Sequence, residues 1–174
     1  MPKIIENIRE KLIEEAKRQV TELGYSAMTI RSVATACGVG TGTVYNYFPS
    51  KDMLVVGFML EDWEICKQAI HQGVAEAEDV KAALFCMHEV LRAYKEEYKI
   101  LFTDENAEAS YRASATKRHH LLCEQLAEPL KIWTRRQDKV DAEFLAEFIA
   151  ENMLTLTMAG KDFESIAAVL LQLF

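Results

Sequence analysis

The chain has 174 residues, which is enough for one sizeable hydrophobic core or for two joined domains. Half of the residues are apolar and 27% are charged, a balance that argues against a disordered or fibrous protein. The net charge of −7 argues against a uniformly basic nucleic-acid binder, yet residues 1–51 hold seven Lys or Arg against five Asp or Glu, so the acidic excess belongs to residues 52–174.

The first third of the chain predicts three helices in quick succession. Apolar residues recur at helical spacing up to Leu23, and Gly24 is placed to end that helix. Thr29 is a good N-cap for a second, short helix that Gly38 ends. Thr41 can cap a third short helix, which stops at Pro49–Ser50.

The rest of the chain also reads as helical, and no strand-like alternation of useful length appears. We therefore predict an all-α fold. Pro129 predicts a kink or a break inside one of the later helical stretches. These stretches cover residues 52–77, 80–98, 107–136, 141–159 and 162–174.

The stretch CGVGTGTVYNYFPSK, residues 37–51, has the pattern of a helix-turn-helix motif. A helix that enters the major groove needs small residues at its start, and Gly40, Thr41, Gly42 and Thr43 provide them. One turn later, Tyr45, Asn46 and Tyr47 offer longer polar side chains for phosphates and bases, and Lys51 adds a cation for a phosphate. The alternative is a small helical subdomain with ordinary turn glycines and core tyrosines.

The span TIRSVATACGVGTGTVYNYFPSKDML resembles the DNA-binding domain of TetR-family transcriptional regulators. Their pattern is a Thr-capped helix, alanines, a Gly-Val turn, a small-residue recognition start and a Tyr-x-x-Phe-x-x-Lys close. The resemblance extends from about Ile4 to Leu60. It implies DNA contacts at Thr29, Arg31, Gly40, Thr41, Gly42, Thr43, Tyr45, Asn46, Tyr47 and Lys51.

The last two helical stretches predict a dimer surface. Residues 165–174 contain no charge, and a terminal helix that is apolar on most sides needs more than one buried contact. We expect a four-helix bundle with a second copy, as the resemblance also implies, so that two recognition helices read a near-palindromic operator. The alternative is burial within one chain. The expected interface residues are Leu145, Phe148, Ile149, Asn152, Leu156, Ile166, Val169, Leu170 and Leu173.

The helical body between these parts predicts a pocket for a small effector, apolar or aromatic with a few polar handles. An aromatic or methionine at helical spacing is more often a core residue, so only part of this set is expected to meet a ligand. The candidates are Trp63, Met87, His88, Tyr94, Tyr98, Phe102, Tyr111 and Trp133.

His119, His120 and Cys123 form a candidate metal group, since His119 and Cys123 share one helical face. We expect no metal or other cofactor there, because surface histidines explain the pattern equally well and the sequence places no further ligand. No nucleotide loop or nucleophile motif points to an enzyme. The four widely spaced cysteines indicate reduced thiols, and without a signal or membrane segment we expect a cytoplasmic protein.

These patterns together predict a DNA-binding domain over residues 1–51 and an effector-binding and dimerisation domain over residues 52–174. The expected function is a homodimeric transcriptional repressor that a small molecule releases from its operator. One alternative is a DNA-binding regulator that a protein partner controls without a pocket. Another is a helical binding protein that has lost its DNA function.

Overall fold

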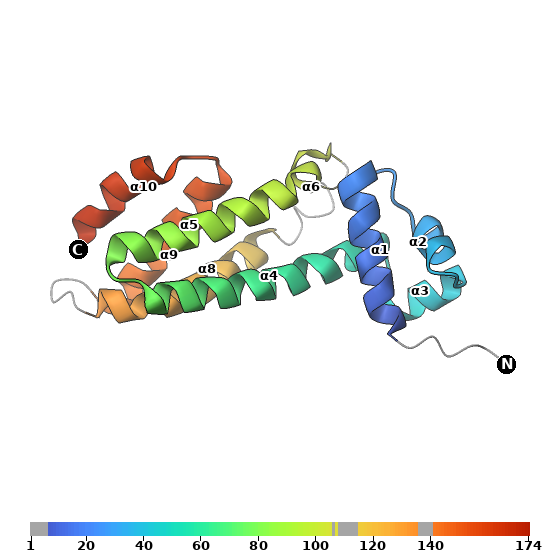
Figure 1. The fold of residues 1–174 in the computed structure, drawn as a ribbon, viewed down its shortest axis with the longest axis horizontal. Helices are drawn as coiled ribbons and strands as arrows, with labels where there is room; N and C mark the ends of the chain where they lie inside the picture. Colours follow the sequence, from blue (N-terminus) through green and yellow to red (C-terminus); the bar gives the residue numbers. More distant parts are fainter. Residues whose placement is uncertain (1–6, 106, 108–114, 136–140) are drawn as a thin grey trace. The chain divides into compact units, whose positions relative to one another are not determined.

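A computed structural model describes residues 7–105, 107, 115–135 and 141–174, without the side chains of residues 115–117. All regular elements in these ranges are helices, which confirms the predicted all-α fold (Figure 1). The α-helices are α1 (Ile8–Leu23), α2 (Ile30–Ala36), α3 (Thr41–Tyr47), α4 (Lys51–Glu76), α5 (Val80–Glu97), α6 (Lys99–Thr103), α8 (Ala115–Thr134), α9 (Ala142–Met158) and α10 (Phe163–Leu170), and a 3-10 turn, η1 (Leu171–Leu173), follows.

The chain divides into two compact units. Unit 1 comprises residues 1–62 and 97–113, and unit 2 comprises residues 63–96 and 114–174, each as far as it is described. The division lies at Asp62 within α4, beyond the boundary at residue 51 that the sequence predicts, and unit 1 also includes α6. The predicted division of function between two domains stays a prediction.

Unit 1 is built around α1, α2 and α3, which follow one another in the sequence and pack together. Val33 of α2 and Val44 of α3 are fully buried, and Phe48 closes the same core. Burying a side chain of this size stabilises a fold by roughly 1.5–3 kcal/mol, so a few such residues suffice to hold α3 in place.

A polar network fixes α1 against α2. The Thr29 hydroxyl accepts from the Ser32 amide and the Ser32 hydroxyl accepts from the Thr29 amide, which forms a capping box at the start of α2. The Ser32 hydroxyl also donates to Gln19 Oε1 at 2.6 Å. Gln19 is buried on α1, and this bond satisfies its carbonyl oxygen. The Thr29 cap confirms the predicted start of α2.

A second polar cluster joins α1 to α4 and to the end of α5 within unit 1. Lys17 Nζ lies 2.6 Å from Asp62 Oδ2 and 2.6 Å from Glu97 Oε1, and the Tyr98 hydroxyl donates to Asp62. Burial alone would lower the pKa of Lys17, but the hydrogen bonds to these two carboxylates outweigh it and raise the pKa. The ammonium therefore stays charged as a bridge inside unit 1.

Unit 2 has one continuous apolar core that α4, α5, α8, α9 and α10 share. Helices α8 and α9 pack against each other and run antiparallel, since Thr134 Oγ1 donates to the Ala142 carbonyl at 2.7 Å and Lys131 pairs with Glu143 at 3.0 Å. Pro129 lies inside α8, which continues through it, so the predicted break is absent. None of the helices in the described part of the chain combines the length and apolarity that a bilayer crossing requires.

Candidate nucleic-acid interface

Helix α3 has one buried side and one exposed side. Val44 is fully buried and Phe48 is 5% exposed, whereas Tyr45 and Tyr47 are 54% and 45% exposed. Thr41, Gly42 and Asn46 also face solvent, and Thr43 is partly buried. The residues expected to touch DNA therefore lie on the outer side of α3, and those expected to pack lie on its inner side.

The turn before α3 requires a glycine at only one position. Gly38 has φ +69°, and it ends α2 with two backbone bonds, from its own amide to the Thr35 carbonyl and from the Val39 amide to the Ala34 carbonyl. This is a Schellman cap, which favours glycine because other residues are strained at positive φ. The identity of Gly38 thus follows from backbone conformation.

Gly40 and Gly42 differ from Gly38. Neither has a positive φ, and a Cβ atom built on either one would meet no described atom within 4 Å beyond the neighbouring residues and the helix's own backbone. Both are exposed. Neither conformation nor internal packing accounts for the missing side chains, so the space beside this backbone is free for another molecule.

The start of α3 also lacks the cap that the sequence predicts. The N-cap residue is Gly40, which has no side chain to accept a hydrogen bond, and Thr41 is the first helical residue. The predicted Thr41 cap is wrong, because Gly40 already has the extended backbone that an N-cap residue adopts. No capping side chain covers the first turn of α3.

The two expected contacts on α2 are both exposed but differ in their bonding. The Thr29 hydroxyl takes part in the capping box, so it already has partners within the chain. Arg31 is exposed and forms no ion pair with a described residue. Arg31 is therefore the cation of α2 whose charge is available to a phosphate.

Lys51 lies differently from the expected phosphate contact. Its Nζ donates to the Tyr25 carbonyl and lies 3.9 Å from the centre of the Tyr25 ring. Burial lowers the pKa of Lys51, against the opposing influence of Asp104 and Asp52. In this conformation Lys51 holds the start of α4 against the α1–α2 connection.

Three other cations in the described part of unit 1 are paired with carboxylates. Arg9 pairs with Glu61, Lys17 with Asp62 and Glu97, and Arg18 with Glu15 and Glu22. The excess positive charge of residues 1–51 is thus largely neutralised within unit 1. The small residues at the start of α3 therefore support DNA binding more strongly than the overall charge does.

The expected effector residues do not come together in one site. Tyr98 and Phe102 lie in unit 1, where Tyr98 is buried and Phe102 is exposed. Trp63, Met87 and Tyr94 belong to the core of unit 2 or pack on it, and buried His88 bonds Thr157. Tyr111 lies outside the described residues. Trp133 alone of the set lines a described hollow, of about 440 Å³, with Glu78, Asp79, Val80, Lys81, Leu171 and Phe174.

The expected interface residues divide into buried and exposed groups. Four of them are buried in the core of unit 2 and pack within one chain, so they are not available to a second copy: Leu145, Ile149, Ile166 and Leu170. Exposed or partly exposed side chains remain at Phe148, Asn152, Leu156, Val169 and Leu173. Phe144, which the sequence analysis missed, is 60% exposed one turn before Phe148.

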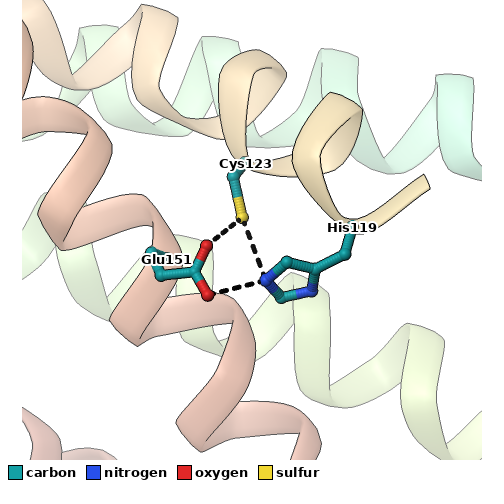
Figure 2. A group of neighbouring side chains, drawn as sticks. All are labelled: His119, Cys123 and Glu151. Carbon is teal, nitrogen blue, oxygen red and sulfur yellow. Dashed lines mark hydrogen bonds and ion pairs between the residues drawn. The ribbon is translucent and has the colours of Figure 1, made fainter. Parts of the chain in front are cut away.

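The candidate metal group contains Glu151 in place of His120. His120 points to Glu124 at 3.3 Å on its own helix, apart from the other two residues. His119 and Cys123 instead meet Glu151 of α9, as Figure 2 shows. The sequence could not identify Glu151, because only the pairing of α8 with α9 brings it to this place.

Comparison with known proteins agrees with the arrangement of α1–α4. Residues 12–57 match the family model described as bacterial regulatory proteins, tetR family. The regulator YhgD of Bacillus subtilis, described as HTH-type, is 33% identical over 105 residues, which span 58% of this chain and 54% of that protein. An HTH-type transcriptional repressor of Mycobacterium tuberculosis is 26% identical over 185 residues, or 98% of this chain and 95% of the repressor.

The fold is also similar beyond the helix-turn-helix. The crystal structure of a TetR-family transcriptional regulator from Streptomyces coelicolor aligns with a TM-score of 0.66 at 19% identity. The alignment covers 95% of this chain and 99% of that one. The likeness in fold therefore extends over nearly the whole chain.

Proposed function

Since the chain belongs to the TetR family of transcriptional regulators, we propose that it is a homodimeric repressor whose α3 helices read a near-palindromic operator. Regulation through DNA binding is common to the relatives that it resembles. The repressor role is supported by the Mycobacterium tuberculosis relative, which is described as a repressor and aligns over nearly the whole chain. Such a protein acts in the bacterial cytoplasm, where its operator lies.

The observation that carries the DNA proposal is the open space beside Gly40 and Gly42. A Cβ atom at either position would meet nothing beyond the neighbouring residues and the helix's own backbone, so we infer that the absence of a side chain serves a molecule outside the chain. A helix without bulky side chains at its start can bring its backbone closer to the base edges in the major groove. Tyr45 and Tyr47 are exposed on the same helix and can donate to phosphate oxygens.

We propose that dimerisation uses the exposed apolar side chains of α9 and α10. Phe144 and Phe148 lie on one face of α9, with their ring centres 6.5 Å apart, and Val169 is 66% exposed on α10. Large apolar side chains grouped in this way favour contact with a second surface. An isologous contact between two such faces would give the twofold symmetry that a palindromic operator requires.

We also propose that a small apolar or aromatic molecule releases the repressor. The hollow beside Trp133 has the volume of common ligand sites and combines apolar walls with Glu78, Asp79 and Lys81. The close packing of Trp63 and Met87 in the core of unit 2 favours the alternative, a regulator that a protein partner controls. A metabolite screen for increased melting temperature, repeated on Trp133→Ala, separates the two proposals.

DNA binding is tested with the duplex upstream of the chain's own gene at two salt concentrations. We expect specific binding that weakens with salt, and a loss of binding of about fivefold or more in Tyr47→Ala. Phe102→Ala, which removes an exposed aromatic elsewhere in unit 1, is the control and should bind like the wild type. Equal binding by Tyr47→Ala and the wild type would refute the assignment of α3.

A further inference from the structure

Three side chains with metal-binding atoms meet on the surface of unit 2. His119 and Cys123 are four residues apart on α8, and Glu151 reaches them from α9 (Figure 2). His119 Nε2 lies 2.7 Å from Glu151 Oε1, Cys123 Sγ lies 3.0 Å from Glu151 Oε2, and Cys123 Sγ lies 3.5 Å from His119 Nε2. One imidazole, one thiol and one carboxylate therefore converge on a single point.

The helices that carry these donors are firmly held. The Thr134–Ala142 and Lys131–Glu143 contacts fix the register of α8 and α9 at the opposite end of α8. Cys123 is buried beside core residues of both helices, whereas His119 and Glu151 are partly open to solvent. The donors thus sit on a rigid support that an ion can approach from outside.

We propose that His119, Cys123 and Glu151 bind one divalent transition-metal ion of the zinc class, with a fourth position left to water or an exogenous ligand. This donor set is the one that zinc and its neighbours prefer, since calcium and magnesium take oxygen ligands almost alone. Three protein ligands and one open position are also the usual coordination of non-structural zinc sites.

The spacing of the donors agrees with such a site. Ligands at zinc bond lengths and tetrahedral angles lie about 3.3–3.6 Å apart, and the sulfur–imidazole distance is 3.5 Å. The carboxylate lies closer to both partners, at hydrogen-bond distances, so the partly exposed side chain of Glu151 has to move away from them to admit an ion. On metal binding the thiol proton passes to solvent and the thiolate sulfur becomes the ligand.

Redox sensing is a poorer explanation of the same group. Cys123 is buried, and its thiol donates to Glu151 Oε2 at 3.0 Å, so oxidants in solvent have little access to the sulfur. A neutral buried thiol reacts slowly with oxidants and disulfides. An ordinary hydrogen-bond cluster is the remaining alternative, and it predicts no metal affinity.

Titration of the whole chain with Co²⁺ tests the proposal, because cobalt reports a thiolate ligand by a near-ultraviolet charge-transfer band. We expect one ion per chain, displaced by Zn²⁺, and a visible spectrum typical of four-coordinate cobalt. Cys123→Ser should abolish the charge-transfer band, and His119→Gln and Glu151→Gln should each weaken binding at least about tenfold. Circular dichroism confirms that each variant is folded.

Two matched variants serve as controls. His120→Gln removes the adjacent histidine, and Cys86→Ser removes another partly buried thiol of unit 2, so both should bind Co²⁺ like the wild type. Absence of cobalt binding by the folded wild type would overturn the proposal. It would also be overturned if the band persisted in Cys123→Ser, if it disappeared in Cys86→Ser, or if Glu151→Gln bound as tightly as the wild type. None of these results depends on DNA binding.

Discussion

Gly38 and Gly42 lie four residues apart, and the reasons for their missing side chains differ. Gly38 adopts a backbone conformation that strains any other residue, while Gly42 has ordinary helical surroundings and open space. The first glycine serves the fold of the helix-turn-helix. The second leaves room for a molecule that the fold itself does not contain.

This difference predicts opposite effects of alanine on stability. Gly38→Ala should lower the free energy of unfolding by about 1–2 kcal/mol, because alanine is strained at φ +69°. Gly42→Ala should leave it unchanged or raise it by up to about 1 kcal/mol, since alanine is the better helix former. Urea denaturation followed by circular dichroism measures both. An equal loss in the two variants would show that Gly42 is required by internal packing.

Arg31 is the exposed cation of α2 that is not paired within the described chain. Arg31→Gln should weaken binding to all duplexes to a similar extent, and it should reduce the slope of log affinity against log salt by about 1. Arg92→Gln is the matched control, because Arg92 is exposed on α5 and pairs with Glu89 at 2.7 Å. If the salt dependence of Arg31→Gln equals that of the control, Arg31 makes no phosphate contact.

Several helix boundaries were predictable from local signals, although the cap of α3 was not. Thr29 begins α2 and Gly24 ends α1, as the sequence indicates. Of the kink or break predicted at Pro129, the break is absent, because tertiary packing against α9 holds α8 together despite the missing amide. Local signals compete with packing energy, and packing is invisible in a single sequence.

For the later helices, the buried and exposed faces were predicted less well than the first and last residues. Helix α9 is apolar around most of its circumference, so the sequence could not separate buried Leu145 and Ile149 from exposed Phe144 and Phe148. Helix α3 was simpler, because its outer side is polar or small and its inner side carries Val44. Glu151 could not be assigned, since its partners lie 28 and 32 residues away on another helix.

The α5–α9 contact predicts a pH dependence of stability. His88 is buried on α5 and its Nδ1 lies 3.0 Å from Thr157 Oγ1 of α9. Burial lowers the pKa of His88, and nearby Arg92 lowers it further, while Glu89 and Asp162 oppose this shift. The unfolded chain thus binds a proton more readily, so stability is complete above the ordinary histidine pKa of about 6.5 and falls below it.

His88→Gln isolates this contribution, because glutamine keeps a polar partner for Thr157 without titrating. The wild type should lose more stability than His88→Gln between pH 7.5 and pH 5.5, by at most about 1.4 kcal/mol per pH unit. Thermal denaturation at several pH values gives both curves. Parallel curves would mean that His88 does not titrate differently in the folded and unfolded chain.

For the whole molecule, the two units have different partners in our account. Unit 1 presents α3 to DNA, and unit 2 provides exposed apolar residues for a second copy and a metal group between α8 and α9. The match to the tetR family model was predictable from about a third of the chain, because the helix-turn-helix combines several ordered signals. The effector site was not, since apolar residues of a core and of a pocket look alike in sequence.

The dimer proposal predicts a change of mass in solution. Val169→Lys places a charge on the exposed side of α10 and should convert the dimer to a monomer, because burying an unpaired ammonium is costly. Ile65→Lys changes an equally exposed apolar residue of α4 and should remain dimeric. Sedimentation equilibrium distinguishes the two masses, and a dimer of unchanged affinity in Val169→Lys would exclude this face as the interface.

The most direct test of the proposed DNA contact at the start of α3 is the affinity of Gly42→Ala for the operator duplex. Fluorescence anisotropy measures it beside the wild type. The account predicts a folded variant whose stability is at least that of the wild type and whose binding is weaker by about fivefold or more, since one methyl group holds the α3 backbone away from the groove. A folded Gly42→Ala protein that binds the operator as tightly as the wild type would contradict it.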